Sequence, residues 1–134
     1  MRPTLGRVND VETLAELEGI LHGDAYRERL HVVNVATRNC GPCKMIEPTY
    51  RRYAKYYADA VFVRCVSDTN GQTKEIADLL EVGEVPHFGF FRDGECVWRY
   101  AGSSEKVLRL TIREFLREGE KGKPKSWKTP KTKR

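Results

Sequence analysis

The chain has 134 residues, of which 40% are hydrophobic and 32% charged, and its formal net charge is +5 at pH 7. This is enough apolar content for one domain with a hydrophobic core, and no apolar run approaches the roughly 18 residues that a membrane-spanning helix needs. Four cysteines without a secretory signal favour a reducing compartment over a secreted disulfide scaffold. The composition therefore predicts a soluble domain that is neither secreted nor transmembrane.

The first part of the chain is predicted to form a strand, a helix and a second strand. The first strand is expected at residues 5–8. Asp10 is the expected N-cap of a helix whose apolar residues recur at helical spacing, and Gly23 is its expected end. After a short helical or irregular link, the β-branched run at residues 31–36 predicts another strand.

The middle of the chain continues this alternation of helices and strands. A helical pattern covers residues 44–58, and the apolar run at residues 60–67 predicts a strand. The Asn70-Gly71 pair is typical of a turn and introduces a helix expected at residues 73–80.

The last elements are a hairpin and a helix. Asp93-Gly94 is a strong two-residue hairpin signal between the expected strands at residues 88–92 and 96–100. Ser103 or Ser104 is expected to cap a closing helix with an apolar stripe. Together, the elements predict an α/β fold with a mixed sheet of four to five strands and helices on both faces.

The most informative motif is Cys40-Gly41-Pro42-Cys43, which lies between a predicted strand and a predicted helix. At a helix N-terminus, free amide groups and the helix dipole favour the thiolate of Cys40, which is the form that attacks disulfides. Cys43, one turn further on, could then attack the mixed disulfide and release a reduced product. Pro42 suits the first turn of a helix because its missing N–H is not needed there. The motif therefore indicates a redox-active disulfide.

A zinc site is the alternative interpretation of two cysteines at this spacing. It would need a second pair of ligands, whereas Cys65 and Cys96 are single and lie in predicted strands. Free cysteines in strands are commonly buried as small hydrophobic residues, so inert packing is expected for both, with regulatory oxidation or an intermolecular disulfide as the alternative. The sequence predicts no metal and no cofactor other than the Cys40–Cys43 disulfide.

Several motifs, spread over residues 8–118, resemble the thioredoxin family. They are CGPCK at Cys40 to Lys44, Pro48 within the following helix, Val85-Pro86 before the strand HFGFFRDG, and Ala101-Gly102 before the last helix. The stretches NCGPCKMIEPTY, EVPHFGFFRDGE and RYAGSSEKV are most similar to the C-terminal domain of the chloroplast drought-induced stress thioredoxins of plants and algae. The resemblance implies a thioredoxin fold and thiol–disulfide exchange.

The resemblance also implies how substrates are held. Pro86 would be a cis-proline whose loop faces the disulfide, and Val85 would offer its backbone to an extended substrate segment. Asn39 and Gly102 would complete the substrate-binding surface. The implied partners are proteins with disulfides and an external reductase as electron donor, because the chain has no nucleotide-binding glycine motif. The implied location is the chloroplast stroma, with the cytoplasm as the alternative.

Four residues depart from the family pattern near this site. Asn39 stands where most thioredoxins have Trp, and Asn34 replaces a buried Asp that helps to deprotonate the resolving cysteine. His87 replaces a Thr and could carry protons, although a single His in a strand is more often packed or solvent-facing. Arg64 takes the place of a lysine beside the buried acid and is expected, if anything, to meet Asn34. These residues are candidates for tuning the exchange reaction.

The C-terminal end is predicted to be separate from the domain. Residues 121–134 hold seven of the 24 Lys and Arg and no acid, so residues 1–120 carry 17 positive and 19 negative charges. We therefore divide the chain into a thioredoxin-like domain, 1–119, and a basic, flexible tail, 120–134. Three hypotheses apply to Lys121 to Arg134: a solvated end, docking to an acidic protein or complex with Trp127 as an apolar contact, or contact with nucleic acid or an anionic membrane.

Two functions follow from these observations. The first is a protein-disulfide reductase in which Cys40 attacks and Cys43 resolves. The alternative is a thioredoxin-like subunit or adaptor of a larger assembly, docked through its basic tail, with redox activity secondary or absent. Asn39, Asn34 and the tail motivate this alternative, whereas the intact cysteine pair argues against it.

Overall fold

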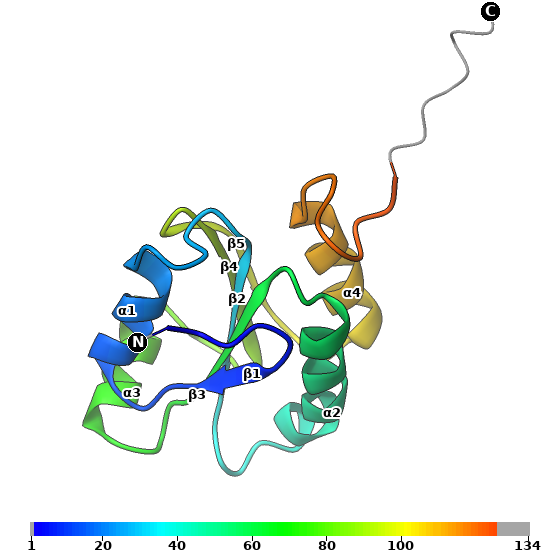
Figure 1. Cartoon of the computed structure of the whole chain (residues 1–134). Coiled ribbons are helices and arrows are strands. Elements are labelled where there is room, and N and C mark those ends of the chain that lie inside the picture. Colours follow the sequence, from blue (N-terminus) through cyan, green and yellow to red (C-terminus); the bar gives the residue numbers. More distant parts are fainter. Residues whose placement is uncertain (1, 126–134) are drawn as a thin grey trace, which may run out of the picture.

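The computed structural model describes residues 2–125 (Figure 1). Within these residues, the chain forms five strands and four helices. The strands are β1 (Val8–Asp10), β2 (His31–Ala36), β3 (Val61–Val66), β4 (His87–Arg92) and β5 (Glu95–Ala101). The helices are α1 (Leu14–His22), α2 (Gly41–Tyr56), α3 (Gly71–Leu79) and α4 (Glu105–Phe115). No helix in this part of the chain is long and apolar enough to cross a membrane.

The strands form one mixed sheet in the order β1-β3-β2-β4-β5. β1, β2 and β3 are parallel, whereas β4 runs antiparallel to both β2 and β5. Helices α1 and α3 cover one face of the sheet, and α2 and α4 cover the other (Figure 1). The prediction of an α/β fold with a mixed sheet and helices on both faces is confirmed.

Each face of the sheet has its own hydrophobic core. Between the sheet and α2 and α4, the ring of Tyr50 contacts Phe62 and Phe88 with centroid distances of 5.4 and 5.6 Å. The Tyr50 hydroxyl donates to the main-chain oxygens of Val32 and Val63 at 3.1 and 2.7 Å, so α2 is fixed to the two central strands. Smaller aliphatic side chains fill the core under α1 and α3.

The N-terminal elements differ from the prediction. The first strand is Val8–Asp10 rather than residues 5–8, because its residues pair in parallel with Phe62–Arg64 of β3. Asp10 is therefore a strand residue and not a helix cap. Thr13 caps α1 instead and forms a reciprocal capping box with Glu16. The helix ends at the expected Gly23.

The predicted hairpin is confirmed. Asp93 and Gly94 have φ values of 56° and 81°, which suit a tight turn between two twisted strands. The β4–β5 ladder shifts register between Phe90 and Phe91, where a bulge changes which side chains of β5 lie on each face. Helix α4 begins after Ser104, whose side chain accepts from the amide of Val107.

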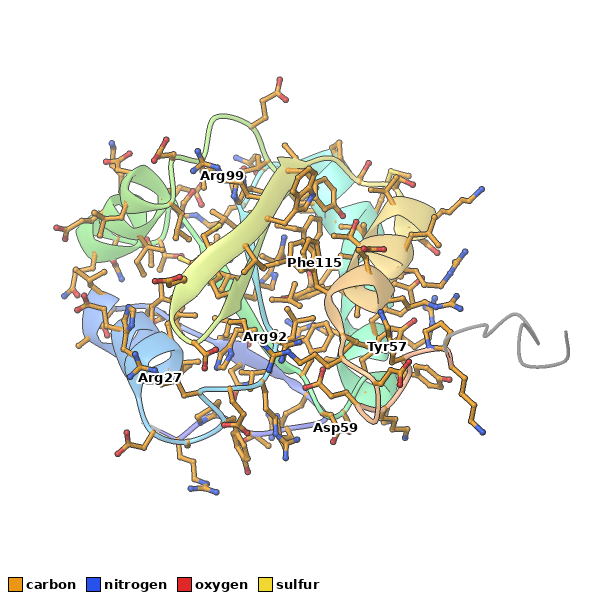
Figure 2. All side chains as sticks on the ribbon, turned by 90° about the horizontal axis from the view of Figure 1, so that it is seen from above. Arg27, Tyr57, Asp59, Arg92, Arg99 and Phe115 are labelled. Atoms are coloured by element: carbon orange, nitrogen blue, oxygen red, sulfur yellow. A yellow bond between two sulfur atoms is a disulfide. The ribbon has the colours of Figure 1, made fainter. Side chains whose placement is uncertain are left out.

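The described residues after α4 fold back onto the domain. Glu120 accepts from the buried guanidinium of Arg92 at 3.2 Å, and the Lys121 amide donates to Asp59 at 2.7 Å. Figure 2 shows Arg92 in the interior, with Tyr57 and Asp59 close to this returning segment. The domain boundary at residue 119 stays a prediction, and Trp127 lies outside the described residues.

Candidate active site

The two motif cysteines lie at the start of α2 and form a disulfide. Cys40 is the N-cap of the helix, and the Cα atoms of Cys40 and Cys43 are 5.2 Å apart. The amide of Cys43 points at the Cys40 sulfur with an N···S distance of 3.1 Å. Gly41 and Pro42 form the first turn between them, so the local structure follows directly from the C-G-P-C order.

The surroundings of this disulfide favour a thiolate when the bond is reduced. The sulfur of Cys40 faces the unpaired amides at the helix N-terminus, and the first turn of α2 contains no acidic residue. Cys40 and Cys43 are 8% and 4% exposed, and burial by itself opposes the charged form, so the amides at the helix N-terminus are what favour the thiolate. Cys40 is the more exposed of the two.

The Val85–Pro86 peptide bond is cis, as the resemblance implies. Val85 packs against a small cluster formed by Ala36, Cys40 and Cys43, which places this loop beside the disulfide. The Gly102 amide donates to the Pro86 main-chain oxygen at 2.9 Å. The structure thus brings Val85 and Pro86 to the cysteines and ties Gly102 to the same loop. Asn39 is exposed immediately before Cys40.

Asn34 and His87 meet at the sheet beneath this loop. Asn34 is buried in β2, and its side-chain amide donates to the main-chain oxygen of His87 at 3.2 Å. His87 is also buried, and burial together with the nearby charge of Arg99 lowers the pKa of its imidazole. His87 is therefore a packed residue, and Asn34 uses its amide to satisfy a strand carbonyl.

Arg64 bonds to groups other than the Asn34 side chain. The two residues are register partners in β3 and β2, but the guanidinium of Arg64 pairs with Glu47 at 3.3 Å and with Asp10 at 3.8 Å. Glu47, on α2, also pairs with Arg51 at 3.0 Å. Sequence reasoning missed Glu47, since a contact across 17 residues leaves no local signal.

The other two cysteines differ in their environments. Cys65 is buried, which confirms the packing interpretation, and burial raises the pKa of its thiol to about 11. The same interpretation is wrong for Cys96, which is exposed on the edge strand β5. Every residue of β5 except Tyr100 is exposed, so the side chain of Cys96 lies on an uncovered part of this edge strand. Among residues 2–125, no group of three or more His, Cys, Asp or Glu residues is placed to hold a metal ion.

A disulfide at a helix N-terminus, covered by a cis-proline loop and set on a five-stranded sheet, defines a class of thiol–disulfide exchange proteins. Comparison with known proteins agrees. The family model described as thioredoxin matches residues 16–114. Thioredoxin from Callithrix jacchus is 34% identical over 93 residues, which cover 69% of this chain and 86% of that protein. The chain belongs to the thioredoxin family and is a thiol–disulfide oxidoreductase that acts as a protein-disulfide reductase.

Solved structures extend this comparison. Thioredoxin f from spinach chloroplast, in its long form, superposes with a TM-score of 0.74 at 26% identity, covering 82% of this chain and 87% of that chain. Thioredoxin f2 in complex with ferredoxin:thioredoxin reductase gives a TM-score of 0.75 at 28% identity, covering 83% and 96% of the two chains.

Proposed function

We propose that Cys40 is the nucleophile and Cys43 the resolving residue of this reductase. In the reduced protein, the Cys40 thiolate attacks a substrate disulfide and forms a mixed disulfide with one substrate sulfur. The S–S bond of the substrate breaks, and its other sulfur leaves as a thiolate. Cys43 then attacks the Cys40 sulfur of the mixed disulfide, releasing the second substrate sulfur and closing the Cys40–Cys43 bond. Two electrons and two protons pass to the substrate, and an external reductase must restore them.

The assignment of roles rests on the position of Cys40 at the helix N-cap. Its sulfur faces the amide of Cys43 and is the more exposed of the two, so it is the better placed to meet a substrate as a thiolate. A Cβ atom built on Gly41 would meet nothing within 4 Å, so the surface beside Cys40 is open to an approaching chain. Cys43 lies beneath it, in reach of the mixed disulfide.

The substrate segment is proposed to lie across the loop at Val85-Pro86. The packing of Val85 against both cysteines supports this position, since a backbone bound there would present its disulfide to Cys40. Asn39 and Gly102 border the same surface and are proposed to contact the substrate. Asn34 and Arg64 are proposed to tune the reaction through the strands that carry the loop and the cysteine motif, whereas the buried His87 is proposed to contribute to packing.

The similarity to thioredoxin f from spinach chloroplast supports a disulfide reductase that acts in the chloroplast. The electron donor is proposed to resemble ferredoxin:thioredoxin reductase, which is the partner of thioredoxin f2 in a solved complex. The chloroplast stroma is the proposed location, and the resemblance to the drought-induced stress thioredoxins fits it. Docking of residues 121–134 to an acidic partner is a further proposal, supported by their charge.

Reduction of insulin by the protein, with dithiothreitol as donor, tests the cysteine roles without the natural reductase. Cys40→Ser should reduce turnover to background, and Cys43→Ser should accumulate a mixed disulfide with the substrate. Cys96→Ser is the matched control, because it removes an exposed thiol away from α2 and should leave turnover unchanged. Turnover by Cys40→Ser equal to that of the wild type would overturn the assignment. No turnover by the folded, reduced wild type would instead favour the adaptor function.

A further inference from the structure

The C-terminal end of α2 carries a second surface feature, far from the disulfide. We call the described residues after α4, 116–125, the returning segment. A groove of about 710 Å³ lies between α2, α4 and residues 122–124 of this segment. Three tyrosines and three arginines line it: Tyr53, Tyr56, Tyr57, Arg52, Arg109 and Arg113. Because α2 rises by about 1.5 Å per residue, this groove is roughly 20 Å from Cys40 along the helix. We call it the α2–α4 groove.

The arginines of the α2–α4 groove have no carboxylate partner among residues 2–125. Arg52 makes only a long hydrogen bond to the Thr49 hydroxyl, at 3.4 Å, and neither Arg109 nor Arg113 forms an ion pair in this part of the chain. Both face Tyr57: burial raises the pKa of that phenol, and the charges of Arg113 and Arg109 oppose the rise.

Two carboxylates of the loops beside the groove are engaged elsewhere. Asp59 pairs with Arg29 at 3.2 Å and accepts from the Lys121 amide, and Glu120 pairs with Arg92 inside the domain. These bonds also hold the returning segment in place. Lys123, which lines the groove, and Lys121, which lies over Tyr56, add further positive charge to it.

The returning segment is fitted closely to the groove. The ammonium of Lys123 donates to the main-chain oxygens of Arg113 and Glu114 at 2.8 and 3.3 Å, which satisfies the end of α4. Gly122 has a φ of 92°, and a Cβ atom at this position would overlap the ring of Tyr57. A fixed cationic groove therefore exists before any ligand binds, which lowers the entropic cost of binding.

We propose that the α2–α4 groove binds an acidic segment of a partner protein. Guanidinium groups pair with carboxylates in bidentate geometry, and the groove is lined by one from α2, Arg52, and two from α4, Arg109 and Arg113. The chain's own C-terminal residues do not suit it, since residues 125–134 carry five further positive charges and no acid. The proposal adds a docking surface to the reductase and leaves the disulfide free to react.

The aromatic residues favour an acidic polypeptide over a nucleic acid. Tyr56 is the most exposed of the three rings, at 57%, and the Lys121 ammonium lies over it at 5.7 Å from its centroid. Tyr57 is buried and packs edge-on against both Tyr53 and Tyr56. Single-stranded nucleic acids bind through free ring faces on which bases stack. The groove offers guanidinium groups for pairing, and the Lys121 ammonium lies over its most exposed ring.

Fluorescence anisotropy with a labelled oligoglutamate peptide tests the proposal on the full chain. Arg109→Gln with Arg113→Gln should weaken binding about tenfold or more, since two charge-assisted contacts are lost. Arg52→Gln alone is the second variant, on the opposite helix. The matched control is Arg7→Gln with Arg27→Gln, which removes the same charge from two exposed positions elsewhere and should leave the affinity within about twofold. Circular dichroism verifies that each variant is folded.

Two outcomes would contradict the proposal that the α2–α4 groove binds an acidic segment. Equal losses in the groove and control variants would mean that net charge, and not the groove, attracts the peptide. Tighter binding of a length-matched oligothymidylate than of oligoglutamate would assign the groove to nucleic acid. Insulin reduction separates this proposal from the reductase mechanism, because the groove variants should keep full turnover and Cys40→Ser should keep full peptide binding.

Discussion

The two ends of α2 carry two different sites, which are built from different chemical groups. The N-terminal end uses backbone amides, two small sulfur side chains and a proline, and its two cysteines are buried. The C-terminal end uses long cationic and aromatic side chains drawn from two helices and a returning segment, and it is open. A site made by local backbone geometry tolerates changes far away in the chain. A site assembled from distant segments depends on each contact that holds those segments together, so mutations should affect the two ends unequally.

Loss of the Arg92 guanidinium should give the largest change in stability. Arg92 is 8% exposed and bonds to Glu120, to the Phe115 main-chain oxygen at 2.6 Å and to the Glu28 main-chain oxygen at 2.7 Å. Arg92→Met leaves these acceptors without a donor, and breaking a buried pair in this way costs about 3–5 kcal/mol. Urea unfolding should report this loss, and adding Glu120→Gln should recover part of it.

A surface arginine provides the control for Arg92. The pair of Arg99 with Glu81 joins side chains that are 45% and 71% exposed, so Arg99→Met should cost less than about 1 kcal/mol. Because Arg92 holds the returning segment, Arg92→Met should also weaken oligoglutamate binding while leaving insulin reduction unchanged under folding conditions. Equal effects of the two substitutions on stability would contradict the role given to Glu120.

At the redox end, Asn34→Asp should produce the next largest effect. Asn34 is 4% exposed and donates to the His87 main-chain oxygen, and an ionised carboxylate cannot donate. Burial raises the pKa of such a carboxyl above the value of about 3.9 in the unfolded chain. The folded state then binds the proton more tightly, so the stability of Asn34→Asp falls relative to the wild type as pH rises from about 4 through the raised pKa.

The expected cost of Asn34→Asp at neutral pH is about 1–3 kcal/mol, the range for a buried polar group that loses its partner. Urea titrations across the pH range measure it. In the insulin assay, the variant should gain a pH-dependent step that the wild type lacks, because the family resemblance places an acid here to deprotonate Cys43. Identical pH profiles for both proteins would show that residue 34 has no part in the resolving step.

Two glycines of the returning segment permit a matched test of the groove. Gly119 and Gly122 have φ values of 93° and 92°, but a Cβ atom at residue 119 meets nothing within 4 Å, whereas one at residue 122 overlaps Tyr57. Alanine at either position adopts an unfavourable backbone conformation, at about 1 kcal/mol. Gly122→Ala should therefore destabilise the protein by about 1 kcal/mol more than Gly119→Ala. Of the two variants, only Gly122→Ala should weaken oligoglutamate binding. Equal losses of stability and equal affinities for the two variants would exclude close packing of residue 122 against Tyr57.

The redox end was predictable from sequence because its signals are local. The C-G-P-C motif between a β-branched run and a helical pattern predicts a strand-to-helix turn with a sulfur at the N-cap, and the Asp93-Gly94 turn likewise carries its own conformational signature. The start of the chain was harder. Asp10 resembles a helix cap in sequence, yet pairing of β1 with β3, more than 50 residues away in the chain, makes it a strand residue. Tertiary pairing overrode a local preference.

The α2–α4 groove, at the other end of α2, has no comparable local signal in the sequence. The boundary at residue 119 stays a prediction, and the contact of Glu120 with Arg92 can be seen only once β4 and the end of α4 are placed together. The same holds for Arg52 and Arg109, which belong to separate helices. Cys96 was expected to pack, and the edge position of β5 leaves it exposed. Each of these features depends on which distant segments of the chain lie together in the fold, and on which residues they leave uncovered.

The expected effect that is smallest at neutral pH concerns two buried histidines, one toward each end of the sheet. His31 begins β2 and is 2% exposed, and its Nδ1 lies 2.9 Å from the Arg29 main-chain oxygen; His87 begins β4 beside the cis-proline loop. Burial lowers the pKa of both imidazoles. The unfolded chain therefore binds protons more readily below the ordinary pKa of about 6.5, so stability is full above that pH and is lost as pH falls toward the lowered values.

Each histidine should contribute a slope of up to about 1.4 kcal/mol per pH unit in that window, and His31→Gln or His87→Thr should remove its own share. Urea unfolding at several pH values between about 7 and about 5 measures the slopes of the wild type and of the two variants. Because His87 is packed, His87→Thr should alter stability without moving the pH profile of insulin reduction. A shift in that profile for His87→Thr, but not for His31→Gln, would instead make His87 a proton carrier of the redox end.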